Sequence, residues 1–217
     1  MHTQAVEDYL KTIYEIQSQQ GKVATTVLAE RMGVAPASVT GMIKKLADMR
    51  LVLYERYQGV TLTETGQKIA LEVIRHHRLV ELYLAEALGV PWDQVHDEAE
   101  KWEHVLSEDL EDRMDEALGY PTIDPHGAPI PTRDGYVDAV PNLCLIDLLP
   151  GQTAIIAEVS DHNADMLRQL GERGLYPATS ILVLDSTETG MTLRRNGEEH
   201  LVELETATHV FVRDVQD

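Results

Sequence analysis

The 217-residue sequence has little of what builds cross-linked or membrane-embedded proteins. Its single cysteine, Cys144, excludes an internal disulfide and a CxxC zinc or redox motif, so we expect a small buried apolar residue there. No apolar run approaches the roughly 18 residues that a membrane-spanning helix needs. The first ten residues carry the acids Glu7 and Asp8 and no apolar signal-peptide core. These absences predict a soluble, cytoplasmic protein.

Basic residues are also scarce, and their distribution is uneven. The formal net charge of −19 would argue against a nucleic-acid partner if it were spread evenly. Residues 1–71, however, hold eight Lys or Arg against seven acids, and the remaining residues hold ten against thirty. This charge distribution indicates that the near-neutral first third can approach a polyanion and that the very acidic remainder can bind cations.

The first third has the pattern of a winged helix-turn-helix. Apolar residues at Val6, Leu10, Ile13 and Ile16 have helical spacing. Two short helices follow, joined by a turn at Gly33. Two β-rich runs joined by Gln58-Gly59 then predict a hairpin. The expected helices and strands cover residues 6–20, 26–32, 38–49, 51–57 and 60–63.

The rest of the chain is predicted to form more helices and then a small β domain. Thr63 is placed to cap a long helix, and Ser107 to cap a shorter one. These helices have more apolar surface than a winged domain can bury, which indicates a dimer interface. Five prolines between residues 121 and 141 suggest a linker. The expected helices are 64–88, 92–106, 107–119 and 164–173, and the expected strands are 153–159, 180–185, 190–194, 200–204 and 209–212.

These patterns predict a mainly α protein with a small β domain. Three domains are expected, at residues 1–71 (winged helix-turn-helix), 72–141 (helical, with a Pro-rich linker) and 142–217 (a small β-barrel or sandwich).

A recognition helix presents its N-terminal residues to base edges, while nearby cations contact phosphates. The second helix of the predicted pair offers short polar or small side chains and then two lysines, and the wing adds further phosphate contacts. The expected DNA-contacting residues are Ala37, Ser38, Thr40, Lys44, Lys45, Arg56 and Tyr57. The alternative is a helical pair whose lysines are only a solvated face.

A second functional pattern combines histidines with acids. In a continuous helix over residues 92–106, His96, Glu100, Glu103 and His104 project within about 100° of arc. On the preceding helix His77 and Glu81 are i, i+4 neighbours, and antiparallel packing would bring them beside His96. The alternative is a solvated acidic helix face. The adjacent His76 is expected to be an ordinary surface histidine.

The whole chain resembles the diphtheria toxin repressor family of metal-dependent regulators, including its manganese-sensing branch. The resemblance rests on short motifs spread along the sequence. They are Glu7-Asp8-Tyr9-Leu10, Pro36-Ala37-Ser38-Val39-Thr40, Leu62-Thr63-Glu64-Thr65-Gly66, His77-Arg78-Leu79, the run from Val95 to His104, Asp124-Pro125-His126-Gly127 and the stretch from Leu167 to Pro177.

The resemblance implies a homodimeric repressor that binds a double-stranded DNA operator when Mn(II), or alternatively Fe(II), is bound. It also implies that residues 142–217 form an SH3-like, FeoA-like domain. The implied primary metal site uses Asp8, Glu100, Glu103 and His104. The implied second site uses His77, Glu81, His96, Glu158 and Asp161.

Three departures from the family's patterns matter. Asp8 and Glu100 are typical of the manganese branch, because iron-type members have Met and Cys there. That branch has a glutamate where this chain has Lys11, and it lacks the C-terminal domain. Gly41 replaces a longer polar residue on the recognition helix, so the operator need not be that of either branch.

Two other functions compete with a regulator. The His and Glu cluster is also compatible with a metallohydrolase that keeps a coordination position open for water. No HExxH, GxSxG or Walker motif is present, however, and a winged helix would be idle in an enzyme. A metal-buffering protein without DNA function is the second alternative. The sequence therefore favours a non-enzymatic regulator.

Overall fold

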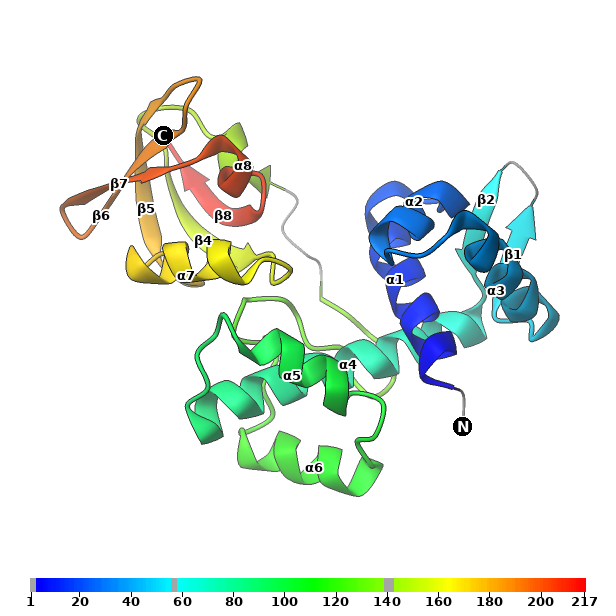
Figure 1. The fold of residues 1–217 in the computed structure, drawn as a ribbon. Helices are drawn as coiled ribbons and strands as arrows, with labels where there is room; N and C mark the ends of the chain where they lie inside the picture. The colour runs from blue at the N-terminus through cyan, green and yellow to red at the C-terminus, as the bar shows by residue number, and fades with distance from the viewer. Residues whose placement is uncertain (1–2, 56–57, 139–142) are drawn as a thin grey trace. The chain divides into compact units, whose positions relative to one another are not determined.

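A computed structural model describes residues 3–55, 58–138 and 143–217 (Figure 1). The chain divides into two compact units. The first contains residues 1–76, 103–106 and 131–136, and the second contains the remainder.

Three helices form the body of the first unit, namely α1 (Gln4–Gln20), α2 (Thr25–Arg31) and α3 (Pro36–Asp48). Helix α1 ends at Gly21, whose φ of 78° suits glycine. Proline at the first position of α3 costs no hydrogen bond, because that N–H has no partner within the helix. One face of each helix enters a common core that includes Leu10, Ile13, Leu28, Val39, Ile43 and Leu46.

The predicted wing is present. Strands β1 (Val52–Glu55) and β2 (Gly59–Leu62) pair antiparallel. Val23 adds a bridge to Val60, with two N–H···O bonds of 2.9 Å. The wing residues Arg56 and Tyr57 lie outside the described part of the chain. Three helices followed by a hairpin confirm the winged helix-turn-helix prediction.

Helix α4 (Glu64–Leu88) has the limits expected from the sequence. The hydroxyl of Thr63 accepts a hydrogen bond from the N–H of Gly66 at 3.1 Å and so caps its first turn. Gly89, with φ 68°, follows its last residue.

Helix α5 (Val95–Trp102) is shorter than the expected helix over residues 92–106. Glu103 and His104 lie in the turn after it. The prediction of one continuous helix face with four metal-ligating residues is therefore wrong. Helix α6 (Glu108–Ala117) begins where Ser107 accepts a hydrogen bond from the N–H of Leu110, as expected.

The segment expected to be a linker is only partly exposed. Asp124, His126, Ala128 and Ile130 are all buried. The carbonyl of His126 accepts a hydrogen bond of 2.9 Å from the N–H of Val159. Proline and glycine correctly indicated a loop here, but residues 121–130 are packed within the second unit and residues 131–136 belong to the first.

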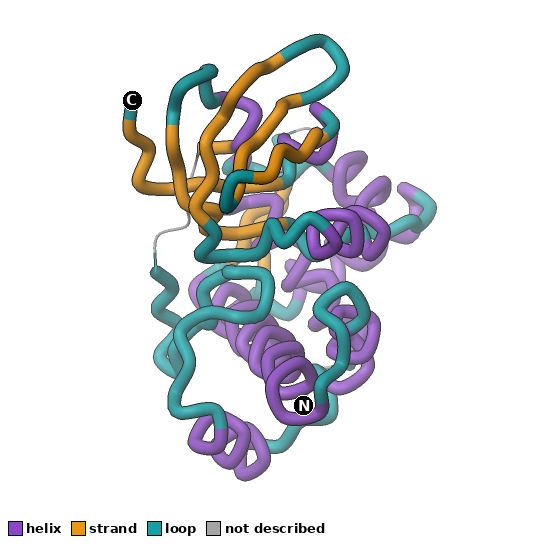
Figure 2. The backbone as a smooth tube through the Cα atoms, turned by 90° about the vertical axis from the view of Figure 1, so that its left-hand side faces the viewer, coloured by secondary structure: helices purple, strands orange, loops and turns teal. Residues whose placement is uncertain are grey.

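The C-terminal part of the second unit is a six-stranded antiparallel sheet with the order β3-β8-β4-β5-β6-β7. Figure 2 shows its strands in orange, and β8 leads to the C-terminus. The strands are β3 (Leu143–Cys144), β4 (Thr153–Val159), β5 (Ser180–Ser186), β6 (Met191–Arg195), β7 (Glu198–Val202) and β8 (Val210–Gln216). The helical segments are η1 (Leu145–Asp147), α7 (Ala164–Glu172) and α8 (Leu204–Ala207).

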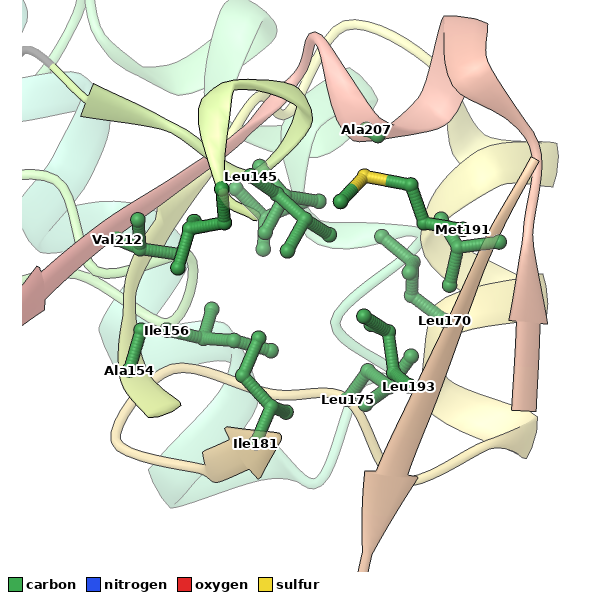
Figure 3. Packing of buried hydrophobic residues seen from close by; sticks show 14 of the residues in the cluster. Leu145, Ala154, Ile156, Leu170, Leu175, Ile181, Met191, Leu193, Ala207 and Val212 are labelled. Carbon is green, nitrogen blue, oxygen red and sulfur yellow. The ribbon is translucent and has the colours of Figure 1, made fainter. Parts of the chain in front are cut away.

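A single apolar core holds this domain together. Figure 3 shows side chains from the sheet, α7, the loop after α7, α8 and η1 around it, including Ile156, Leu170, Leu175 and Leu193. Two local expectations were wrong. The strand expected over residues 200–204 ends at Val202 before α8, and Cys144 is only partly buried.

Candidate metal centre

The first cluster of possible metal ligands lies in the first unit. Asp8 comes from α1, and Glu103 and His104 come from the turn after α5. The Nε2 atom of His104 lies 2.7 Å from Oδ1 of Asp8 and 3.3 Å from Oε1 of Glu103. Three of the four primary-site residues expected from the family resemblance therefore lie together.

The geometry around His104 fits a bound cation. Its side chain is only 6% exposed. Within the described residues its Nε2 atom makes no hydrogen bond, although two carboxylate oxygens lie beside it. A divalent cation satisfies a buried imidazole nitrogen and adjacent carboxylates together.

The other nitrogen of His104 is held by Glu7, a residue that sequence reasoning did not single out. The distance from Nδ1 of His104 to Oε2 of Glu7 is 2.7 Å. A carboxylate at Nδ1 favours the tautomer that has its proton on Nδ1 and its lone pair on Nε2. The only signal in the sequence was that Glu7 and Asp8 are consecutive.

Glu103 is also held by two basic side chains. The ammonium of Lys11 donates to Oε2 of Glu103 at 2.7 Å, and both side chains are nearly or fully buried. Nδ1 of His76 lies 3.1 Å from the backbone carbonyl oxygen of Glu103. The expectation of a surface histidine is therefore wrong, because His76 is buried against this turn.

Glu100 belongs to the second unit. Its carboxylate is 45% exposed, and Oε1 lies 3.7 Å from Nδ1 of His77 and 3.9 Å from Nε2 of His96. Because α5 ends at Trp102, Glu100 is on the helix whereas Glu103 and His104 follow it.

A second cluster, formed by His77, Glu81, His96 and Asp161, lies within the second unit. Oε1 of Glu81 is 3.1 Å from Nε2 of His77 and 3.4 Å from Nδ1 of His96. Nδ1 of His96 is also 3.3 Å from Oδ2 of Asp161. Helices α4 and α5 and the turn after β4 thus bring together four of the five residues expected for the second site.

Glu158, the fifth expected residue, is not among these grouped ligand atoms. Its Oε2 atom is buried and has no hydrogen-bond partner in the described part of the chain. Burial raises the pKa of Glu158, and the positive charge of Arg78 opposes that rise.

Two further residues, Asp124 and His126, join Glu81 from the loop after α6. Nδ1 of His126 lies 3.6 Å from Oε2 of Glu81. Neither residue was a predicted ligand. The Asp-Pro-His-Gly motif had entered only as a family motif within a segment interpreted as a linker.

The buried acids of this cluster change the pKa values of the neighbouring groups. Burial raises the pKa of Asp124, and the nearby Glu81 raises it further, to about 7. Burial lowers the pKa of His96, but hydrogen bonds to Asp161 and Glu81 more than offset this and raise it to about 10. Burial also opposes protonation of His126, yet Glu81 raises its pKa to about 9. The neighbouring acids therefore favour the positively charged forms of His96 and His126 when no metal ion is bound.

The expected DNA-reading residues lie on α3. Ala37, Ser38, Lys44 and Lys45 are exposed. Thr40 is half-buried, and its hydroxyl donates to the carbonyl of Pro36 at 3.0 Å. Gly41 is exposed, and a Cβ atom added there would meet nothing within 4 Å.

Three family models match the chain. Residues 1–60 match the iron dependent repressor N-terminal DNA binding domain. Residues 63–132 match the iron dependent repressor metal binding and dimerisation domain, and residues 143–214 match the FeoA domain.

Known proteins match over most of the chain. The iron-dependent repressor IdeR of Mycobacterium tuberculosis is 31% identical over 209 residues, covering 90% of each chain. The diphtheria toxin repressor of Corynebacterium diphtheriae is 30% identical over 203 residues, covering 89% of each. A solved manganese-dependent transcriptional repressor in complex with manganese has a TM-score of 0.88 and 38% identity, covering 95% of this chain and 98% of that one.

The fold and these relatives define a metal-dependent DNA-binding regulator. The chain belongs to the diphtheria toxin repressor family. Because the matched relatives are transcriptional repressors and not enzymes, the metallohydrolase alternative is wrong. None of the described helices is long and apolar enough to cross a membrane.

Proposed function

We propose that the chain is a homodimeric repressor that binds a double-stranded DNA operator when Mn²⁺ occupies the primary site, with Fe²⁺ as the alternative metal. The observation that carries this proposal is the cluster of Asp8, Glu103 and His104, with a buried nitrogen that makes no hydrogen bond to any described residue. We also propose that the protein acts in the cytoplasm and that its domains divide near residues 71 and 141.

The donor atoms favour manganese. Asp8 and Glu103 offer carboxylate oxygens, and His104 offers one imidazole nitrogen. Carboxylates suit Mn²⁺, whereas thiolate and thioether ligands favour softer metals. We retain Glu100 as a proposed fourth ligand because the family resemblance implies it and because its side chain is also a carboxylate.

In the activation step, α1 is held against the turn after α5. A bound divalent cation supplies the positive charge that lets the carboxylates of Asp8 and Glu103 remain close to each other. Without it, their repulsion favours release of α1. Because α1 shares a core with α3, fixing α1 limits the positions that the recognition helix adopts. By linkage, metal raises the affinity for DNA as much as DNA raises the affinity for metal, typically by about 1–3 kcal/mol.

The second site is proposed to stabilise the second unit. Its ligands would be His77, Glu81, His96 and Asp161, with Glu158 as a further ligand. These residues come from α4, α5, β4 and the turn after β4. A metal there would tie the helical part of the unit to the SH3-like domain.

Exposed apolar side chains in the helical part support the homodimer. Leu88, Leu110, Tyr120 and Ile123 are each between 45% and 67% exposed. Large apolar side chains that stay exposed in a single chain are candidates for burial in an interface. The protein should sediment as a dimer of twice 24.3 kDa, and a monomer at micromolar concentration would contradict this part of the proposal.

On the DNA side, we propose that Ala37, Ser38 and Thr40 face base edges and that Lys44 and Lys45 contact phosphates. Arg56 and Tyr57 of the wing remain proposed phosphate contacts on sequence grounds alone.

A gel shift with the protein's own promoter region, with and without Mn²⁺, tests the function directly. Binding should require the metal. Changing Lys44 and Lys45 to Ala should weaken binding to all sequences and flatten its salt dependence. The matched control is Lys68→Ala, an exposed lysine outside α3, which should change neither. Metal-independent binding, or an unchanged salt dependence in the double variant, contradicts the proposal.

The choice of metal has its own test. Asp8→Met combined with Glu100→Cys should shift the response toward Fe²⁺, Co²⁺ and Ni²⁺, because softer sulfur ligands replace oxygen. Operator affinity is measured with each metal under anaerobic conditions. If the wild type answers to Zn²⁺ as well as to Mn²⁺, or if the variant keeps the same ranking, the ligand assignment is wrong.

A further inference from the structure

The two carboxylate oxygens of Glu103 have different neighbours, and both neighbours lie in the first unit. Oε1 faces the metal cluster, because it lies 3.3 Å from Nε2 of His104. Oε2 faces the ammonium of Lys11, which donates to it at 2.7 Å. The two oxygens of this proposed ligand therefore differ in what they can bind.

Lys11 opposes a metal ion at Oε2, because its ammonium has a charge of the same sign. Its side chain is 11% exposed and that of Glu103 is fully buried, so water and salt screen the ammonium only weakly. A cation bonded to Oε2 at about 2.2 Å would lie within about 5 Å of the ammonium, and two positive charges that close together in a protein interior repel each other. A cation bonded to Oε1 alone avoids this close approach.

Glu103 is held in this orientation at both its side chain and its backbone. Lys11 holds the carboxylate, and Nδ1 of His76 lies 3.1 Å from the backbone carbonyl oxygen of Glu103. His76 is itself buried. Turning the carboxylate so that both oxygens reach one cation would break the ion pair or displace the turn after α5. The geometry therefore favours coordination through one oxygen.

We propose that Lys11 determines how Glu103 binds the primary cation. Its ammonium holds Oε2, so Glu103 donates Oε1 alone. The proposal rests on the proposed metal-dependent function, and it adds a residue that sets the relative affinities of different metals. Mn²⁺ would gain most from a second oxygen because it accepts octahedral oxygen coordination, whereas Zn²⁺ is almost always four-coordinate in closed protein sites. Lys11 therefore reduces the affinity for Mn²⁺ more than that for Zn²⁺, and it raises the concentration of free Mn²⁺ at which the site fills.

The test measures the dissociation constants of Mn²⁺ and Zn²⁺ for the full-length protein by competition with a fluorescent chelator. The primary site is the one whose binding is lost in Asp8→Asn. In Lys11→Met, the ratio of Mn²⁺ affinity to Zn²⁺ affinity at this site should rise by about tenfold, which is typical when a partner of a metal ligand is changed. Lys11→Arg keeps a positive charge beside Oε2 and should keep the wild-type ratio. The control Lys22→Met, which removes a lysine from an exposed ion pair, should also keep it.

The ratio separates this role from a merely structural one. If Lys11 only stabilised α1, its removal would lower the affinity for every metal by the same factor, because the fraction of closed protein affects all metals equally. The ratio would then stay the same. Infrared difference spectra give an independent readout, since the separation of the two carboxylate stretching bands depends on whether one or both oxygens bind the metal. With Mn²⁺ bound, Lys11→Met should gain a two-oxygen carboxylate signal relative to the wild type.

Lys11→Gln tests the proposal if Lys11→Met does not fold, because it keeps a polar side chain at this position without the charge. Its ratio should rise in the same direction. An unchanged ratio in the folded neutral variants, an equal rise in Lys11→Arg, or infrared spectra that match the wild type would overturn the proposal. Mn²⁺ binding that stays intact in Asp8→Asn would refute the primary site, and with it the proposed function. Loss of a cation in Asp8→Asn together with an unchanged ratio in Lys11→Met would refute the role of Lys11 alone.

Discussion

The buried ion pair between Lys11 and Glu103 yields the sharpest prediction on stability. Its charged atoms are 2.7 Å apart, and the Glu103 side chain is fully buried. At that distance the attraction is about 6 kcal/mol with an effective dielectric constant of about 20. Removing the ammonium leaves a buried carboxylate with one fewer basic neighbour. Lys11→Met should therefore destabilise the metal-free protein by about 3–5 kcal/mol, as is typical when one partner of a buried pair is lost.

Amide hydrogen exchange of α1 is the suitable assay, because the chain has two compact units and need not unfold in one step. In EDTA, the free energy of opening of α1 should be about 3–5 kcal/mol lower in Lys11→Met than in the wild type. Combining it with Glu103→Gln should restore most of the loss, since no buried charge then lacks its partner. Lys22→Met is the control, because Lys22 pairs with Glu55 at 3.1 Å on the exposed surface and should cost less than about 1 kcal/mol.

Mn²⁺ should protect the Lys11→Met variant more than the wild type, because the carboxylate of Glu103 then faces the metal without a competing ammonium. Exchange rates in α1 that do not change in Lys11→Met, or that change equally in Lys22→Met, refute the reasoning.

Two further predictions concern single residues. Glu7→Gln should weaken Mn²⁺ binding about 10–100-fold, because it removes the charged acceptor that orients His104. The control Glu15→Gln, on the same helix, should leave Mn²⁺ binding unchanged. Fluorescence-monitored metal competition measures both affinities, and equal affinities would exclude an orienting role for Glu7. Gly66→Ala should destabilise the fold by at least about 1 kcal/mol, because its methyl group would lie 2.0 Å from a backbone carbonyl oxygen. Gly41→Ala should stabilise the fold by about 0.5–1 kcal/mol, because the added methyl group meets open space on a helix. Thermal unfolding measures both changes.

Elements whose limits are marked by local chemistry could be predicted from the sequence. Helix α4 was predicted to the residue, because the capping hydroxyl of Thr63 and the flexible Gly89 are adjacent to its ends. Helix α5 was predicted too long. Immediately after α5, Lys11 contacts the side chain of Glu103 and His76 contacts the backbone of Glu103. Both contacts come from distant parts of the chain, so no local sequence pattern reveals them.

The residues of the candidate site also divide into those that a local sequence pattern indicates and those that depend on distant contacts. Residues with a regular helical spacing, such as His77 and Glu81, were found from the pattern and the family resemblance. His126 was missed because a proline- and glycine-rich stretch predicts a loop but does not say whether that loop is buried. Glu7 was missed because its role depends on which face of α1 meets His104.

Helix α4 limits where the chain can tolerate the insertion or deletion of a residue. His76 and His77 are consecutive residues, yet one contacts the turn at Glu103 and the other contacts Glu81 and His96. Adding or deleting one residue in the helix before them would rotate both by about 100° and disconnect two sites at once. Insertions in this lineage should therefore be absent from α4 and tolerated instead in the exposed turn at residues 187–189, where only the local hairpin would be affected.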